Sequence, residues 1–184
     1  MQWHSRFSDR QMRGIIMPTL YVITGPAGVG KSTISRKVAE ASSKSALIEG
    51  DDLYAQIIGG YVDPWLEGNH LDTFWKLSIS SMKVYLEAGF DVVYNYIVSP
   101  DRLEMIKKEL KDYTIKFTVL LVNEESILAR DLRRPEEYQM KERCIVLLNE
   151  FRDHNYDEKF ILDTSHLTVD ETVNKVLSED RFVI

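Results

Sequence analysis

The chain has 184 residues, of which 44% are hydrophobic and 28% are charged, and its formal net charge is −6. These values are typical of one globular domain, and no apolar run approaches the roughly 18 residues that a membrane span needs. The negative charge disfavours binding along a nucleic-acid backbone, which depends on clustered Lys and Arg. We therefore expect small-molecule partners, no nucleic acid and no membrane, with the chain acting as a monomer or a homodimer.

The first 17 residues precede the first strand pattern. They carry three Arg and lack the continuous apolar stretch of about 7 to 15 residues that a secretory signal contains. We therefore expect a cytoplasmic protein with a flexible N-terminal extension over residues 1–17 and one domain over residues 18–184. Met17 directly precedes the first predicted strand and is an alternative start.

From Thr19 onward, short apolar runs rich in β-branched residues alternate with longer helical patterns. This alternation is typical of βαβ units and a parallel sheet. Strands are predicted at 19–24, 45–49, 91–98, 115–122 and 159–164. Helices are predicted at 31–42, 52–58, 70–88, 101–111, 124–133, 137–153 and 169–179. Because right-handed crossovers bring the carboxyl ends of parallel strands to one edge, we expect ligands to bind along that edge.

The first predicted strand is followed by a glycine-rich loop that satisfies the pattern G-x-x-x-x-G-K-[ST] and opens a predicted helix. This context identifies a phosphate-binding loop, whose backbone N–H groups and helix N-terminus attract phosphate oxygens. Lys31 is expected to reach the β- and γ-phosphates, and the Ser32 hydroxyl to ligate Mg²⁺. The residues predicted to bind the nucleotide here are Gly25, Pro26, Ala27, Gly28, Val29, Gly30, Lys31, Ser32 and Thr33.

Two acids, Asp51 and Asp52, follow the second predicted strand at the same edge. A carboxylate in this position can accept the proton of an attacking hydroxyl and orient it for in-line transfer. Asp51 is the candidate base, whereas Asp52 is expected as an N-cap or first-turn acid of the next helix. The alternative that both acids only cap this helix remains open.

The third predicted strand carries Asn95, where P-loop proteins often have a carboxylate that holds the Mg²⁺ shell. An amide cannot supply that negative charge. Either Asp51 also serves the outer shell of the metal or catalysis is weak, so Ser32 is the one residue assigned as a direct metal ligand.

Residues 59–75, between the second and third strands, are rich in aromatic and turn residues. Core or lid packing would explain most of these side chains, and His70 is expected where a helix begins. The segment offers no Arg and is followed by a single Lys76 as an anchor for an acceptor carboxylate. The residues that could line an acceptor pocket are Tyr61, Trp65, His70, Trp75 and Tyr96.

A basic segment, Arg130, Arg133 and Arg134, has helical spacing and is ended by Pro135, which predicts a lid over about residues 130–145. The alternative is a solvated basic face that pairs with Glu124, Glu125 and Glu136. Cys144 in the same region is expected to be a packed thiol. Asp163, Thr164 and Ser165 after the last strand are candidates for a base pocket, although turn chemistry explains them equally well.

Taken together, four segments resemble small P-loop kinases of the nucleoside-monophosphate-kinase-like superfamily. They are GPAGVGKST (25–33), IEGDDLY (48–54), RDLRR (130–134) and ILDTSHLTVDETV (161–173). Within that superfamily the chain looks most like gluconate kinase-like proteins and the chloramphenicol phosphotransferase group, over about residues 19–180. The resemblance implies an α/β P-loop NTPase three-layer sandwich with a five-stranded parallel sheet and a helical lid.

The same resemblance implies an enzyme that transfers a phosphate from ATP, with Mg²⁺, to a hydroxyl of a small molecule such as a sugar acid, a metabolite or an antibiotic. It assigns Asp51 as the base, Arg130 as the adenine contact and Arg134 as the phosphate contact, with Arg133 as the substitute. The lack of a cationic anchor in residues 59–75 makes gluconate a less favourable acceptor. Two alternatives remain, a nucleoside or nucleotide kinase and a non-catalytic ATP-binding regulatory module, the second motivated by Asn95.

Overall fold

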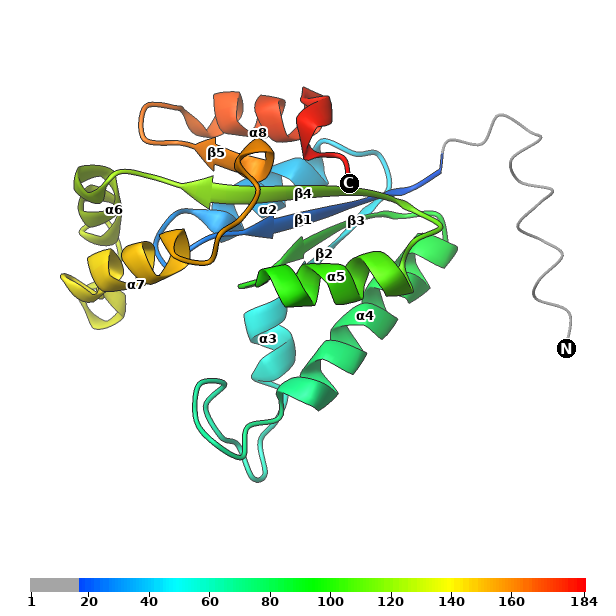
Figure 1. The fold of residues 1–184 in the computed structure, drawn as a ribbon, viewed down its shortest axis with the longest axis horizontal. Helices are drawn as coiled ribbons and strands as arrows, with labels where there is room; N and C mark the ends of the chain where they lie inside the picture. Colours follow the sequence, from blue (N-terminus) through cyan, green and yellow to red (C-terminus); the bar gives the residue numbers. More distant parts are fainter. Residues whose placement is uncertain (1–16) are drawn as a thin grey trace, which may run out of the picture.

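The computed structural model describes residues 17–184, so the predicted extension lies outside the described residues except for Met17. Its centre is a five-stranded parallel sheet with the strand order β2-β3-β1-β4-β5 (Figure 1). The strands are β1 (Thr19–Thr24), β2 (Ser45–Glu49), β3 (Asp91–Asn95), β4 (Thr114–Leu121) and β5 (Ile161–Asp163).

Helices cover both faces of this sheet. In Figure 1, α4 and α5 lie on one face, α2 and α8 lie on the other, and α6 and α7 lie beyond the carboxyl ends of the strands. The bounds are α2 (Lys31–Glu40), α3 (Gly50–Tyr54), α4 (Leu71–Glu87), α5 (Pro100–Glu109), α6 (Glu124–Asp131), α7 (Arg143–Arg152) and α8 (Val169–Ser178).

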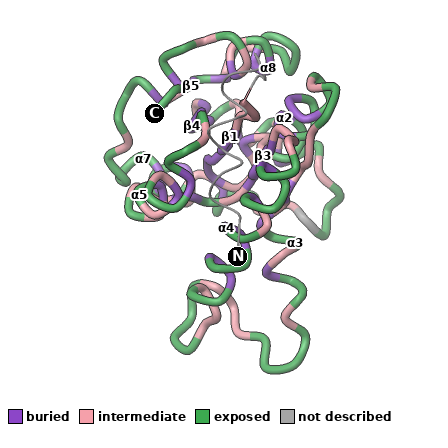
Figure 2. Tube along the Cα trace, turned by 90° about the vertical axis from the view of Figure 1, so that its right-hand side faces the viewer, coloured by how far each residue is buried: buried purple, intermediate pink, exposed green. Residues whose placement is uncertain are grey.

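Two apolar clusters fill the space between the sheet and its helices. Successive residues of a strand point to opposite faces, so Leu20 and Val22 of β1 join the cluster under α4 and α5, while Ile23 joins the cluster under α2 and α8. Figure 2 shows buried residues concentrated on the central strands. Because a parallel sheet is buried on both faces, this arrangement confirms the predicted three-layer α/β sandwich.

Two predicted strands are longer than the observed ones. The strand predicted at 91–98 ends at Asn95, and the backbone N–H of Val98 donates to the Thr24 hydroxyl at 2.9 Å instead of to a neighbouring strand. The strand predicted at 159–164 is reduced to β5, because a 3₁₀ turn (Glu158–Phe160) precedes it. Asp157 starts that turn by accepting a hydrogen bond from the N–H of Lys159.

The predicted helix at 137–153 is also wrong in its first part. Residues Glu136–Tyr138 form a short 3₁₀ helix, and α7 begins only at Arg143. The Asp131 carboxylate accepts hydrogen bonds from the N–H groups of Met140 and Lys141, and Lys141 adopts a positive φ of 51°. A residue in that conformation cannot continue an α-helix, so the tertiary contact overrides the local helical pattern.

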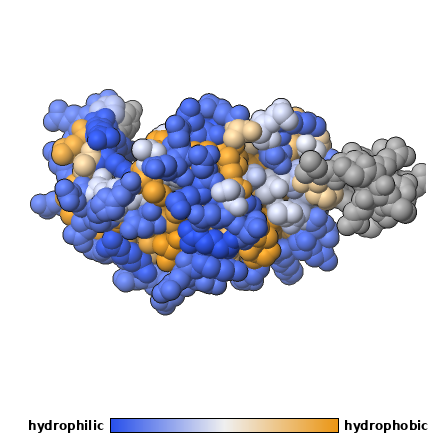
Figure 3. Space-filling view, turned by 90° about the horizontal axis from the view of Figure 1, so that it is seen from above, coloured by the Kyte–Doolittle hydropathy of each residue, from blue (hydrophilic) through white to orange (hydrophobic). Residues whose placement is uncertain are grey.

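The helix predicted at 52–58 is instead α3, which begins at Gly50 and ends at Tyr54. After α3 the chain forms a projecting loop before α4, visible at the bottom of Figures 1 and 2. The face drawn in Figure 3 is mostly hydrophilic, with its hydrophobic residues in separate patches. Among the described residues, no helix combines the length and apolarity needed to cross a bilayer.

Candidate active site

A cleft of about 680 Å³ lies at the carboxyl ends of the strands. The glycine-rich loop, the start of α3, the end of α6 and the loop between β5 and α8 contribute its walls. The lining residues are Ala27, Gly28, Val29, Gly30, Lys31, Ser32, Thr33, Ile34, Asp51, Arg130, Arg133, Arg134, Thr164, Leu167, Thr168, Val169 and Thr172. Most of the predicted nucleotide-binding residues, the predicted base and all three arginines therefore share one cleft.

The glycine-rich loop connects β1 to α2 in a conformation that other residues would strain. Gly25 has a φ of +152°, and a Cβ there would lie 2.5 Å from the carbonyl oxygen of Leu120. Within residues 17–184, no side chain caps the start of α2, and its first turn contains no acid. The first N–H groups of a helix have no intrahelical partner and carry partial positive charge, so this end of α2 can accept an anion.

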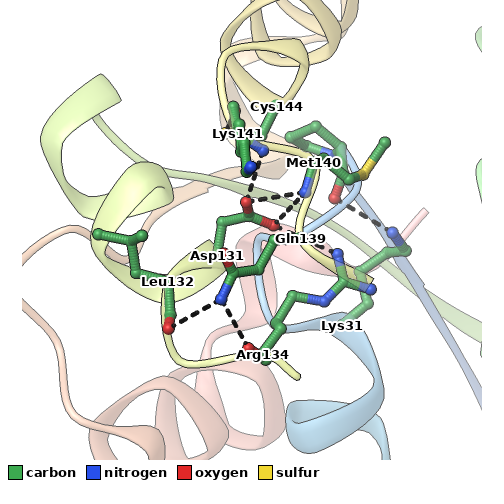
Figure 4. A network of polar contacts seen from close by, with 9 residues as sticks. Lys31, Asp131, Leu132, Arg134, Gln139, Met140, Lys141 and Cys144 are labelled. Atoms are coloured by element: carbon green, nitrogen blue, oxygen red, sulfur yellow. Dashed lines mark hydrogen bonds and ion pairs between the residues drawn. The ribbon is translucent and has the colours of Figure 1, made fainter. Parts of the chain in front are cut away.

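Lys31 is the first residue of α2, and its Nζ donates to the carbonyl oxygen of Pro26 at 3.2 Å. Burial, with a smaller contribution from the charge of Arg134, lowers the pKa of Lys31 to about 8 against the opposing effects of Asp51 and Glu49. Figure 4 shows Lys31 and Arg134 close together. Two cations that repel each other beside a helix N-terminus form a site suited to a multiply charged anion.

Three polar side chains meet next to the glycine-rich loop, at the ends of β2 and β3. Asn95 is buried, and its Nδ2 donates to the Ser32 hydroxyl at 3.1 Å and to the Glu49 carboxylate. The amide nitrogen must face Glu49, because an ionised carboxylate only accepts hydrogen bonds. The Asn95 carbonyl oxygen is left buried with no partner among the described residues.

Sequence reasoning missed Glu49, the last residue of β2. Its Oε2 lies 3.5 Å from the Ser32 Oγ, and burial raises the pKa of its carboxyl, an effect that the Asn95 hydrogen bond partly offsets. The Ser32 hydroxyl and the Glu49 carboxylate are oxygen ligands that Mg²⁺ prefers, usually with several waters and substrate phosphates. These residues therefore fit a magnesium ion, and Glu49 supplies the carboxylate that the sequence of β3 lacks.

Gly50 lies between the two acids at the end of β2. A Cβ at Gly50 would lie 2.5 Å from the ring of Tyr96, so this close approach requires glycine. Glu49, before this glycine, is the last residue of β2, and Asp51, after it, is exposed and lines the cleft. Asp52 lies in the first turn of α3, whose N-cap is Glu49, so the first-turn alternative for Asp52 is correct and the N-cap alternative is wrong.

Arg130 joins the glycine-rich loop to the loop after β5. Its Nη1 donates to the carbonyl oxygen of Val29 at 2.6 Å and to the Thr164 hydroxyl at 3.1 Å, and its Nη2 donates to the carbonyl oxygen of Thr164 at 2.7 Å. Burial, with repulsion from Arg133, lowers the pKa of Arg130. The arginine is therefore fixed at the end of the cleft that also contains the start of α8.

That end of the cleft includes residues of the 161–173 segment that were not predicted individually as site residues. They are Leu167, Thr168, Val169 and Thr172 from the segment after β5. Of the three base-pocket candidates, Thr164 lines the cleft, whereas Asp163 accepts hydrogen bonds from the N–H and hydroxyl of Ser165 in an Asx turn. Turn chemistry therefore explains Asp163 and Ser165, and Thr168 with Glu171 caps α8.

The aromatic candidates separate into buried and exposed groups. Trp75 is buried in the core against Phe74, whereas the Trp65 side chain is 73% exposed on the projecting loop. His70 is the N-cap residue of α4, as expected for a residue that starts a helix, and its Nε2 shares a hydrogen bond with the carbonyl oxygen of Gly60. Burial raises the pKa of the Tyr96 phenol, and the charge of Asp51 adds to this effect, whereas the exposed Tyr61 donates from its hydroxyl to Asp63 Oδ1 at 3.2 Å.

No family model matches the chain, and no curated protein matches its sequence. Solved structures do match. A sugar kinase from a Janibacter species has 16% identity and a TM-score of 0.66, with 88% of this chain and 93% of that chain covered. A gluconokinase from Sinorhizobium meliloti has 20% identity and a TM-score of 0.59, with 88% and 90% covered.

A third solved structure, the tunicamycin resistance protein of Deinococcus radiodurans, has 22% identity and a TM-score of 0.62, with 88% of this chain and 94% of that chain covered. These matches extend over nearly the whole described chain, so the likeness concerns the complete fold and not the glycine-rich loop alone. The chain therefore shares the fold of P-loop kinases of the gluconate kinase-like type, as the motifs in its sequence indicated.

Proposed function

We propose that the chain is an ATP-dependent kinase that transfers the γ-phosphate to a hydroxyl of a small molecule. The observation that carries this proposal is the meeting of a phosphate-binding loop, the Asp51 carboxylate and the lid arginines in one cleft. Similarity of fold to a sugar kinase and a gluconokinase supports the same class of reaction. The acceptor would enter beside Asp51, opposite the nucleotide.

In the proposed reaction the acceptor hydroxyl attacks the γ-phosphorus while its proton passes to the Asp51 carboxylate. The bond between the γ-phosphorus and the bridging oxygen breaks, and ADP leaves with that electron pair. Lys31 and Arg134 face the charge that develops on the transferring group, where positioned cations stabilise the transition state most. Arg130 and the residues that start α8 hold the base end of the nucleotide.

Bound Mg²⁺ would neutralise phosphate charge during the transfer. Ser32 is the proposed direct ligand, with Glu49 holding water molecules of its shell, and the Asn95 amide nitrogen positions both side chains by donating to them. The nearby Glu49 carboxylate weakens the case for a non-catalytic module, because that case was based on the missing acid at Asn95. A nucleoside or nucleotide kinase shares the fold and remains the second candidate.

The proposal is tested by ADP release with ATP and Mg²⁺ across sugars, sugar acids, nucleosides, nucleotides and hydroxylated antibiotics. We expect one acceptor class to raise turnover well above background hydrolysis, because phosphoryl transfer depends on a positioned hydroxyl. If ATP raises the melting temperature but no acceptor raises turnover, the regulatory module is the better reading. Stimulation only by nucleosides or nucleotides would select the second candidate.

The depressed pKa of Lys31 makes nucleotide binding dependent on pH. Lys31 loses its charge as the pH rises through about 8, so the Kd for ATP with Mg²⁺ should rise up to about tenfold per pH unit above that value. Titration calorimetry between about pH 7 and 9.5 should also detect proton uptake on binding. Tyr96, whose pKa burial raises to about 12, stays neutral over this range.

The matched control for this experiment is Lys31→Arg, because a guanidinium keeps its charge at every pH used. Whatever its absolute affinity, that variant should bind ATP with a Kd that does not change over the same range. A flat profile in the unmodified protein would contradict the proposed contact between Lys31 and the phosphates.

A further inference from the structure

Asp131, the last residue of α6, is a buried carboxylate that no step of the proposed reaction uses. Its side chain is 2% exposed. One oxygen, Oδ2, accepts hydrogen bonds from the N–H groups of Met140 at 2.9 Å and Lys141 at 2.7 Å, and Oδ1 lies 3.1 Å from the same Met140 nitrogen. Oδ1 also lies 3.5 Å from the Arg134 Nη1. A single carboxylate therefore contacts both the beginning and the end of the segment 132–141 (Figure 4).

The hydrogen bonds favour the ionised form of Asp131. Burial acts to raise the pKa of its carboxyl, but the N–H groups of Met140 and Lys141, together with Arg134, outweigh burial and lower it. Successive N–H groups that converge on one anion require an unusual backbone, and Lys141 supplies it with a φ of 51°. The carboxylate thus fixes the conformation in which α7 begins.

The same segment carries Arg134 into the cleft. Gln139 links the end of the segment to its beginning, because its Nε2 donates to the carbonyl oxygen of Arg134 at 2.9 Å and to that of Leu132 at 3.3 Å. The guanidinium makes one long contact with Asp131 and is 39% exposed. An arginine has five N–H donors, and within the described part of the chain the only acceptor of the Arg134 side chain is Asp131 Oδ1, so most of its donors can face a ligand.

We propose that Asp131 is a positioning residue that locks segment 132–141 and thereby presents Arg134 to the phosphates. The inference rests on the proposed function, which assigns Arg134 to the transferring phosphate. A purely structural Asp131 would stabilise the fold without any dependence on Arg134. The two readings therefore differ in whether the effects of Asp131 and Arg134 on nucleotide binding and turnover are coupled.

The test is a double-mutant cycle of Asp131→Asn and Arg134→Gln, with the Kd for ATP and Mg²⁺ measured by calorimetry and kcat measured with the best acceptor. Asp131→Asn should raise Kd about tenfold and lower kcat about 100-fold, because small displacements of a catalytic group are costly. In the Arg134→Gln background the same change should alter both by less than about twofold. Equal losses in the two backgrounds would overturn the inference.

Two additional variants separate positioning from stability. Asp91→Asn removes a carboxylate that accepts from the Thr19 N–H and the Ser42 hydroxyl, away from the cleft; it should lower the melting temperature and leave Kd unchanged. Gln139→Ala removes the two hydrogen bonds from Gln139 within the segment but keeps the Asp131 carboxylate that accepts from the Met140 and Lys141 N–H groups. It should raise the Kd for ATP about threefold, and only when Arg134 is present. If Asp131→Asn does not fold, the test rests on Gln139→Ala, and an unchanged Kd for ATP in that variant would overturn the inference.

A structural readout does not depend on any acceptor. Glutamyl endopeptidase should cleave Asp131→Asn faster after Glu136 or Glu137, which are exposed in the segment, or after Glu142, which is exposed directly after it. Asp91→Asn should be cleaved at these positions at the rate of the unmodified protein. If no acceptor is ever found, the proposed function fails while the coupled Kd and the cleavage pattern still support the inference. Unchanged cleavage and an unchanged Kd in folded Asp131→Asn would overturn the inference even if the enzyme is a kinase.

Discussion

Replacement of Asp51 by Asn is expected to lower kcat for phosphorylation of the acceptor by about 10²- to 10⁴-fold, the usual contribution of a positioned general base. An amide keeps the size of the side chain but cannot take the proton of the acceptor hydroxyl. Asp51 is exposed in the first turn of α3 and lines the cleft. Steady-state ADP release at saturating ATP measures the effect.

The neighbouring Asp52 provides the matched control. Both acids lie in the first turn of α3, so each loses a similar interaction with the helix N-terminus, worth about 0.3 to 1 kcal/mol. Asp52→Asn should therefore match Asp51→Asn in melting temperature but keep its turnover. Full turnover in Asp51→Asn would rule out this carboxylate as the base, whereas equal losses in both variants would indicate an effect through α3 and not through proton transfer.

The parts of the fold that depend on local pattern were predictable from the sequence. The bounds predicted for β1 and β2 equal the observed ones, because each is a short apolar run bounded by turn residues. The errors at the end of β3 and the beginning of α7 have tertiary causes. A hydroxyl from β1 takes the N–H of Val98, and the buried Asp131 carboxylate takes two N–H groups from a segment with a helical sequence pattern.

The candidate site divides in the same way. The glycine-rich loop, Asp51 and the arginines were found because spacing and flanking elements identify them. Glu49 was missed because its contact with Ser32 depends on the strand order β2-β3-β1, in which β3 lies between β1 and β2 and brings the ends of the three strands side by side. The spacing Glu49-Gly50-Asp51 could have indicated Glu49. Two acids separated by a glycine at the end of a strand can act separately, one near the metal and the other near the acceptor.

Replacement of Arg134 by Gln is expected to lower kcat by about 10³- to 10⁵-fold, as for other arginines that stabilise a transferring phosphate. That loss corresponds to roughly 4 to 7 kcal/mol of transition-state stabilisation. Arg134 is close enough to Lys31 for its charge to lower the pKa of that lysine. Its free N–H donors can follow the charge that develops on the equatorial oxygens, so kcat should fall far more than the affinity for ATP.

Arg133 is the matched control because it lines the same cleft from the adjacent position and is more exposed. Arg133→Gln should change kcat by less than about tenfold, since water and salt screen the charge of a solvent-exposed cation. Single-turnover measurements would show whether the Arg134 loss lies in the chemical step. A large loss in Arg133→Gln with near-normal Arg134→Gln would transfer the phosphate contact to Arg133, and it would also remove the reason for Asp131 to hold Arg134 in place.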